Sequence, residues 1–247
     1  MSEKVTILIP SCDAYADAWE PFFYCFNRSW PDCPFEKVLI SNHLEAPDTK
    51  TKTIKIGDDK GYCDNLIYAL EQIDSDYIIL WLEDLLLAAI PKGDTPVIIK
   101  EAIQANAGYL RLWQISKTQA SSSDLFYELP KESKFRVSLK PALWKKSVLL
   151  SLLVSGESPH DLERKGSIRS NDLPEKFLSL TKNSEEYRFS TVNLIYRGKY
   201  EQAALNYLKK IGFDIKPSNR KIKPQFLYLL QHRLLNPIAR LFKLLGN

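Results

Sequence analysis

One apolar stretch, Asp76–Leu87 (DYIILWLEDLLL), constrains the fold of this chain more than any other. Its run of aliphatic and aromatic residues is typical of a strand that is buried on both faces in the middle of a parallel sheet. Glu83 and Asp84 interrupt the run toward its carboxyl end. Because ligands bind outside the carboxyl ends of the strands in open α/β sheets, these two carboxylates lie where a functional site is expected.

Strands and helices are predicted to alternate around this stretch. Further strands are expected at Val5–Pro10, Phe35–Ser41, Thr51–Ile56, Tyr109–Ile115, Phe135–Leu139 and Thr191–Tyr196. Helices are expected at Trp19–Trp30, Tyr62–Ile73, Thr95–Ala107, Leu143–Val154 and Glu201–Ile211. The Ser-rich segment Ala120–Asp124 reads as a loop that borders the site. This order predicts an α/β fold with a mainly parallel sheet flanked by helices.

The net charge of +4 hides an asymmetry along the chain. Residues 209–247 contain nine basic residues and one acidic residue, a net charge of +8, so the other 208 residues carry −4. Two amphipathic helices, Gln225–Leu235 and Pro237–Leu245, are expected in this basic tail. The tail either lies on an anionic surface, a membrane or a nucleic acid, or packs its leucines on the body. The predicted domains are therefore 1–208 for the sheet and 209–247 for the tail.

Composition favours a globular protein of the cytoplasm. The four cysteines show no CxxC spacing, which gives no support to a zinc knuckle or a redox pair, and we expect them to be reduced. The amino terminus enters a strand at once, without the pattern of a secretory signal. No run of about 18 apolar residues is present, so no membrane-spanning helix is predicted.

Two groups of residues near the central stretch have the chemistry of a nucleotide site. Glu83 and Asp84 offer oxygen ligands that suit Mg²⁺ or Mn²⁺ bridging two phosphates, although a pair of solvated charges is the alternative. Lys60 and Gly61 precede the next helix, whose amino end would favour phosphate, and Asp64 and Asn65 could hydrogen-bond ribose or base. Asp64 could equally be an acidic residue that stabilises the first helical turn.

A third group lies in the charged segment GESPHDLERKGS, residues 156–167, which we expect to be a loop. Asp161 and Glu163 are candidates for a general base, and His160 could ligate a metal or bind phosphate. Simple solvation is the alternative for each of them. No GxSxG, HExxH, P-loop or GxGxxG motif occurs, so hydrolase, zincin, P-loop and dinucleotide-enzyme interpretations lack support.

Three segments in this order resemble bacterial GT-A glycosyltransferases related to family 2. They are VTILIPSCDAY, KGYCDNLIYALEQIDSDYIILWLED and GESPHDLE, and the resemblance covers roughly residues 4–200. It implies transfer of a sugar from a nucleotide-diphosphate sugar to a hydroxyl of a glycan or lipid-linked acceptor, as in the synthesis of capsule or lipopolysaccharide O-antigen. A lipid-linked acceptor would explain a basic tail that holds the enzyme at the inner face of the cytoplasmic membrane.

The resemblance also implies roles for individual residues. The family's DxD metal motif falls on Leu82-Glu83-Asp84, where leucine replaces the first aspartate. Donor-binding aspartates fall near Asp13 and Asp64, and the catalytic base falls on Asp161 or Glu163, which implies an inverting transfer.

Two rival functions remain. A nucleotidyltransferase would share the fold, but the loop after the first strand, SCDAYADAW, is not basic and glycine-rich. A non-catalytic glycan- or nucleic-acid-binding protein would use the tail for contact. Under the glycosyltransferase interpretation no nucleic-acid partner is expected.

Overall fold

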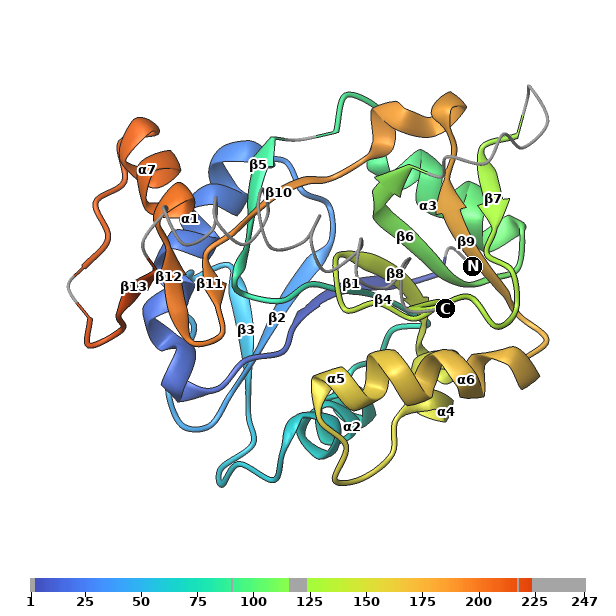
Figure 1. The fold of residues 1–247 in the computed structure, drawn as a ribbon, viewed down its shortest axis with the longest axis horizontal. Coiled ribbons are helices and arrows are strands. Elements are labelled where there is room, and N and C mark those ends of the chain that lie inside the picture. The colour runs from blue at the N-terminus through green and yellow to red at the C-terminus, as the bar shows by residue number, and fades with distance from the viewer. Residues whose placement is uncertain (1–2, 90, 116–123, 217, 224–247) are drawn as a thin grey trace, which may run out of the picture. The chain divides into compact units, whose positions relative to one another are not determined.

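The framework of the protein is an eight-stranded sheet with the order β3-β2-β1-β4-β8-β6-β9-β7 (Figure 1). The computed structural model describes residues 3–89, 91–115, 124–216 and 218–223, and its contacts group the chain into two compact units, 1–191 and 192–247. The sheet belongs to the first unit. Its strands are β1 (Val5–Ile9), β2 (Glu36–Ser41), β3 (Thr51–Lys55), β4 (Tyr77–Leu80), β6 (Ala107–Ile115), β7 (Phe126–Glu128), β8 (Ala142–Lys145) and β9 (Lys176–Leu180).

Six of the eight strands point the same way, and only β7 and β8 are reversed among them. The predicted mainly parallel sheet is therefore confirmed. The chain lays down β1, β2 and β3 toward one edge and then returns to place β4 on the other side of β1. Leu8 of β1 is consequently paired with Val38 of β2 and Leu80 of β4. This reversal is a topological switch point, the place where open α/β sheets bind ligands.

Helices cover both faces of the sheet because its strands carry apolar residues on both sides. In Figure 1, α2, α4, α5 and α6 gather below the sheet. Ile78 and Leu80 of β4 belong to the core formed with α2 and α4, whereas Trp81 packs against Phe22 and Phe26 of α1. The α-helices of this unit are α1 (Trp19–Ser29), α2 (Tyr62–Gln72), α3 (Thr95–Gln104), α4 (Lys146–Leu152), α5 (Pro159–Asp161) and α6 (Ser167–Arg169).

Shorter helical turns complete the first unit. A π-helical turn, η2 (Leu162–Gly166), joins α5 to α6. Three 3₁₀ helices are η1 (Asp13–Ala18), η3 (Ser170–Asp172) and η4 (Lys182–Tyr187). Residues 159–172 thus form one helical run, where the sequence predicted a solvated loop. That expectation was wrong because Ser158 starts the helix: its hydroxyl accepts a hydrogen bond from the backbone N–H of Asp161 (3.1 Å) in a capping box.

The second unit is small. Its described residues form a three-stranded sheet in the order β11-β12-β13 and one helix. Its elements are β11 (Ile195–Tyr196), β12 (Lys199–Glu201), α7 (Gln202–Lys210) and β13 (Ile222–Lys223), while β10 (Ser190–Asn193) spans the junction of the two units. The two tail helices expected in 225–245 lie outside the described residues, and the boundary at 208 stays a prediction. Among the described helices, none is long and apolar enough to span a bilayer.

The sequence predicted one continuous strand in the central stretch, but the structure divides this stretch into two strands. The strand β4 ends at Leu80, and β5 (Leu85–Ala89) begins after a turn and takes no part in the eight-stranded sheet. The Trp81 Nε1–H closes the turn by donating to the carbonyl oxygen of Leu85 (2.7 Å). The break falls on the segment that carries Glu83 and Asp84.

Three other predicted elements were wrong in detail. Segment 135–139 is a loop rather than a strand, because its backbone hydrogen-bonds to side chains of the 159–172 helical run: the Val137 N–H donates to Ser167 Oγ (3.0 Å). The helix expected from Leu143 begins only at Lys146, after β8. The strand expected at 191–196 is divided into β10 and β11. Of the Ser-rich loop, residues 120–123 lie outside the described part of the chain.

Candidate active site

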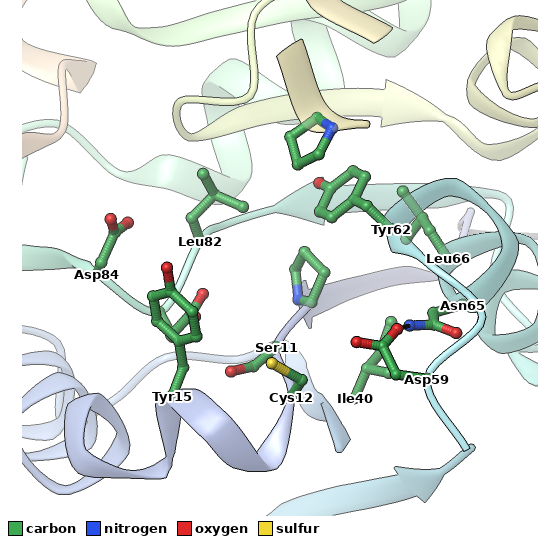
Figure 2. Close-up of a pocket in the computed structure, with 13 residues that line it drawn as sticks. Ser11, Cys12, Tyr15, Ile40, Asp59, Tyr62, Asn65, Leu66, Leu82 and Asp84 are labelled. Carbon is green, nitrogen blue, oxygen red and sulfur yellow. Dashed lines mark hydrogen bonds between the residues drawn. The ribbon is translucent and has the colours of Figure 1, made fainter. Parts of the chain in front are cut away.

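A pocket of about 260 Å³ opens at the switch point between β1 and β4 (Figure 2). Its walls come from the segments that follow β1 and β4, from the amino end of α2 and from Pro159. The polar side chains among its lining residues are Ser11, Cys12, Tyr15, Asp59, Tyr62, Asn65, Glu83 and Asp84. Three predicted site residues, Asn65, Glu83 and Asp84, are thereby brought together.

Glu83 and Asp84 are held by the break between β4 and β5. Trp81, immediately after β4, is fully buried, and its ring lies 6.4 Å from Phe22 and 5.0 Å from Phe189. Glu83 is itself only 7% exposed. Trp81 therefore fixes the turn, and the turn places both carboxylates at the pocket. Figure 2 shows Asp84 beside Leu82.

Asp59 organises the amino end of α2, and the sequence analysis missed it. Its Oδ1 accepts hydrogen bonds from the Asn65 amide (2.7 Å, dashed in Figure 2) and from the Gly61 N–H (2.8 Å). The Asn65 Oδ1 in turn accepts from the Lys60 N–H (3.1 Å). Gly61 has φ +98°, a left-handed conformation that favours glycine. An aspartate two residues before a glycine that starts a helix is a recognisable turn signal.

Asp13 and Asp64, the two aspartates expected to bind the donor, are engaged within the protein. The Asp13 carboxylate accepts from the backbone N–H groups of Asn42 (3.0 Å) and His43 (3.1 Å), which ties η1 to the end of β2. The Asp64 carboxylate accepts from the Ser155 hydroxyl (2.6 Å) and the Gly156 N–H (2.8 Å). These hydrogen bonds lower the pKa of Asp64. Neither aspartate is among the residues that line the pocket.

Asp161 caps its own helix. Its carboxylate accepts from the Ser158 hydroxyl (2.6 Å) and lies 3.1 Å from Lys165 Nζ. The hydrogen bond from Ser158, and then that from Lys165, lower the pKa of Asp161 to about 2. His160, the neighbouring residue, is exposed. Among the described residues, no group of three or more His, Cys, Asp or Glu side chains is arranged to hold a metal ion, so His160 does not join Glu83 and Asp84.

The charge of Glu163 acts on a residue in the wall of the pocket. Its Oε1 accepts from the Leu139 N–H (2.9 Å), which fixes the side chain. Burial, above all, raises the pKa of the Tyr62 hydroxyl in the pocket wall well above its usual value, and nearby charges, among them Glu83, Glu163 and Asp84, raise it further. Carboxylates from two distant segments therefore act on the same wall of the pocket.

Comparisons with known proteins bear on the fold. No protein-family model matches the sequence, and no curated protein sequence matches it. Among solved structures, TarS 1–349 of S. aureus in complex with UDP is similar with a TM-score of 0.50 at 12% identity over 75% of this chain. The mannosyltransferase PcManGT of Pyrobaculum calidifontis, in complex with GDP-Man and Mn²⁺, gives a TM-score of 0.50 at 15% identity over 80% of this chain.

The chain spans 59% of the length of each of these two proteins. At such identities the similarity is one of fold. The mainly parallel sheet flanked by helices agrees with it. The chain therefore has the GT-A fold found in glycosyltransferases.

Proposed function

We propose that this protein is a glycosyltransferase that moves a sugar from a nucleotide-diphosphate sugar to a hydroxyl group. The observation that carries the proposal is the pocket at the β1–β4 switch point, with Glu83 and Asp84 in its lining. The complexes of the two similar structures with UDP and with GDP-Man support a donor of this class. Asn65 lines the pocket and would contact the nucleotide, whereas the N–H groups of Lys60 and Gly61 donate to the side chains of Asn65 and Asp59 in its lining.

The residues present fit a divalent cation. Mg²⁺ in nucleotide sites is commonly held by one or two carboxylates, water and substrate phosphates, and does not need an all-protein cage. Glu83 and Asp84 supply two carboxylates on one wall of the pocket, and the donor diphosphate would supply the remaining oxygens. Bound there, Mg²⁺ or Mn²⁺ would offset negative charge on the departing diphosphate.

We assign the general base to Glu163. A base works best when its pKa lies near the operating pH, and the pKa of Asp161, about 2, makes that carboxylate a poor proton acceptor. Leu139 binds one oxygen of Glu163, and the other would accept the proton of the acceptor hydroxyl. The acceptor oxygen then forms the new bond to the anomeric carbon while the bond from that carbon to the diphosphate breaks. A single displacement of this kind inverts the anomeric centre.

The acceptor class, which the resemblance implies, and the location, which rests on charge, belong to the same proposal. A glycan or lipid-linked glycan of surface polysaccharide (capsule or O-antigen) synthesis is the expected acceptor. The basic tail would hold the protein at the inner face of the cytoplasmic membrane, because residues 209–247 carry a net charge of +8.

A thermal-shift panel of nucleoside diphosphates and nucleotide sugars, with and without Mn²⁺, tests the proposal. A ligand that binds the native state alone stabilises it by about 2.7 kcal/mol at a hundredfold excess over Kd. We expect one nucleotide to raise the melting temperature, and Mn²⁺ to increase that shift. Failure of every nucleotide to do so would count against the transferase and favour a glycan- or nucleic-acid-binding protein.

The variant Asp84→Asn separates the site from the fold. We expect it to keep the melting temperature of the unliganded protein within a few degrees and to lose the extra shift due to Mn²⁺. A variant that no longer folds would mean that Asp84 has a structural role and that the site lies elsewhere. Release of diphosphate from a nucleoside triphosphate in the presence of a sugar phosphate would instead identify the nucleotidyltransferase alternative.

A further inference from the structure

A second pocket, of about 350 Å³, lies between the loop 132–135 and the helical run that carries Glu163. Its size falls in the range of small-molecule sites, about 300–1,000 Å³. Two of its lining residues are among the most exposed large apolar side chains in the described structure: Phe135 is 49% exposed and Ile168 is 69% exposed. A concave site with two uncovered apolar side chains is suited to a ligand with an apolar face.

The position of Phe135 is fixed by its neighbour. Phe135 has φ +55°, a left-handed conformation that a bulky side chain rarely adopts. The next residue, Arg136, is only 1% exposed and donates to the carbonyl oxygens of Leu129 (3.2 Å) and Ser170 (2.7 Å). Its guanidinium also lies 4.2 Å from the centroid of the Phe177 ring. Since Arg136 points inward and is held from several sides, Phe135 is kept at the surface.

Positive charge surrounds the two apolar side chains. Lys134 and Arg164 line the pocket and are exposed, and neither forms an ion pair with another residue in the described ranges. Lys165 also lines the pocket, but its ammonium group is 3.1 Å from Asp161. Glu132 is the one carboxylate among the lining residues. Two cations thus remain for a ligand, and a guanidinium is suited to bidentate contact with a phosphate or carboxylate.

One helical run contributes residues to both pockets. Pro159, at the start of the helical run, lines the pocket at the switch point, whereas Arg164 and Ile168 line the second. At a rise of about 1.5 Å per residue, Ile168 lies about 14 Å along the axis from Pro159. Glu163 lies between them, in the π-helical turn, a feature often found at functional sites. A sugar bound in the second pocket could therefore present a hydroxyl near Glu163.

We propose that this second pocket is the acceptor site and that it takes an anionic sugar, one that bears a phosphate or carboxylate group. The anion contacts Lys134 and Arg164, and the apolar face of the sugar ring packs on Phe135 and Ile168. The inference rests on the proposed glycosyltransferase function, because it makes Glu163 the base for the sugar bound here.

Methyl NMR of the full chain tests the proposal, with Ile168 as the reporter and Ile168→Val to assign its signal. The probes are glucose 1-phosphate, glucose and inorganic phosphate. We expect glucose 1-phosphate to shift the Ile168 methyl signal with a Kd at least tenfold lower than that of either other probe. Arg164→Ala should weaken this binding about tenfold or more. The matched control is Arg28→Ala, an exposed arginine of α1, and it should leave the Kd unchanged.

Equal binding of glucose and glucose 1-phosphate, or no response of Ile168, would overturn the proposal. So would an Arg164→Ala variant that binds glucose 1-phosphate as well as the wild type does. Nucleotide binding, measured on the same samples, tests the proposed function independently of the acceptor site. Nucleotide binding without a response of Ile168 would retain the transferase and remove this acceptor site. Binding of glucose 1-phosphate to a protein that binds no nucleotide would overturn the role as acceptor site.

Discussion

Two carboxylates that are two residues apart, Asp161 and Glu163, show how neighbouring groups decide what the same chemical group can do. Asp161 accepts from the Ser158 hydroxyl (2.6 Å) and pairs with Lys165, so it stays ionised and holds the helix start. Glu163 accepts a single backbone N–H, from Leu139, and contributes to the raised pKa of Tyr62 in the pocket wall. The first carboxylate therefore has a structural role, and the second is the one that we propose as the general base.

Substitution of these two carboxylates separates their roles. Glu163→Gln should lower kcat for sugar transfer by about 10²- to 10⁴-fold, the usual contribution of a general base, without changing nucleotide affinity. Asp161→Asn should leave kcat within a few fold. Steady-state kinetics and nucleotide titration of both variants check this. Loss of kcat in Asp161→Asn with full activity in Glu163→Gln would reverse the assignment.

The pH dependence of stability gives a second test at Asp161. Because the pKa of Asp161 is lowered to about 2 in the folded state, its ionised form stabilises the protein above the unfolded-state pKa of about 3.9. That contribution is lost as the pH falls toward 2. Asp161→Asn should therefore destabilise the protein at pH 7, and by less at pH 3. Urea denaturation at both pH values measures the difference, and an equal or larger effect at pH 3 would contradict the capping role.

At the scale of elements, the loop 130–139 and the helical run 159–172 behave as one assembly. Backbone N–H groups of the loop donate to Glu163 and Ser167 of the helical run, and Arg136 reaches the carbonyl oxygen of Ser170 (2.7 Å). These contacts fix the Glu163 side chain and hold Phe135 at the surface. An irregular segment is thus as well fixed as a strand, because side chains satisfy its backbone groups.

Arg136→Met tests this assembly. The substitution removes a buried guanidinium and leaves the carbonyl oxygens of Leu129 and Ser170 without their donor, so we expect a loss of about 3 kcal/mol in the free energy of unfolding. Urea denaturation measures it. Arg28→Met, at an exposed site, is the matched control and should change stability by no more than about 0.5 kcal/mol. A similar, small effect in both variants would show that the loop is held by other contacts.

The sequence predicted the regular elements better than the irregular ones. The strands β1, β2 and β3 and the helices α1 and α2 begin and end within a few residues of their expected limits, because periodic apolar residues mark them. The loop 135–139 reads as apolar in part, but Arg136 points inward and bonds to carbonyl oxygens, which no local pattern reveals.

Part of the candidate site could also be predicted from the sequence pattern. Glu83 and Asp84 stand out because charge is unexpected in an apolar stretch, and the structure places both in the pocket. Asp59, Tyr62 and Pro159 were not anticipated. Asp59 acts through a turn, and Tyr62 and Pro159 reach the pocket from segments almost a hundred residues apart, so only the tertiary fold brings them together.

For the whole molecule, charge is distributed unevenly between the acidic body and the basic tail. The described structure reaches Lys223, where β13 pairs with β12, and the chain beyond it carries three arginine or lysine residues and no acidic ones. A cut after Lys223 would remove none of the described helices and strands. Tail and pocket can therefore be tested separately.

Deletion of 224–247 removes three of the nine basic residues of the tail and should weaken binding to vesicles rich in phosphatidylglycerol, because each basic residue contributes about 1 kcal/mol to binding at an anionic surface. The nucleotide-dependent thermal shift should persist, since the pocket residues all lie between 10 and 159. Vesicle co-sedimentation of the two forms, with neutral vesicles as the control, measures the first effect. Equal binding of both forms to anionic vesicles would exclude residues 224–247 as the membrane contact, and loss of folding would show that the fold depends on them.

The pocket also carries a natural reporter of its own occupancy. Burial raises the pKa of all four thiols, to about 12 for Cys25 and about 11 for Cys33 and Cys63, so alkylation at neutral pH should be slow. Cys25 and Cys63 are inaccessible, whereas Cys12 in the pocket lining and Cys33 outside it are partly open. A maleimide should therefore label Cys12 and Cys33 first. A nucleotide in the pocket would shield Cys12 and leave Cys33 as an internal standard, so the ratio of the two adducts in a mass spectrum would measure binding without any engineered label.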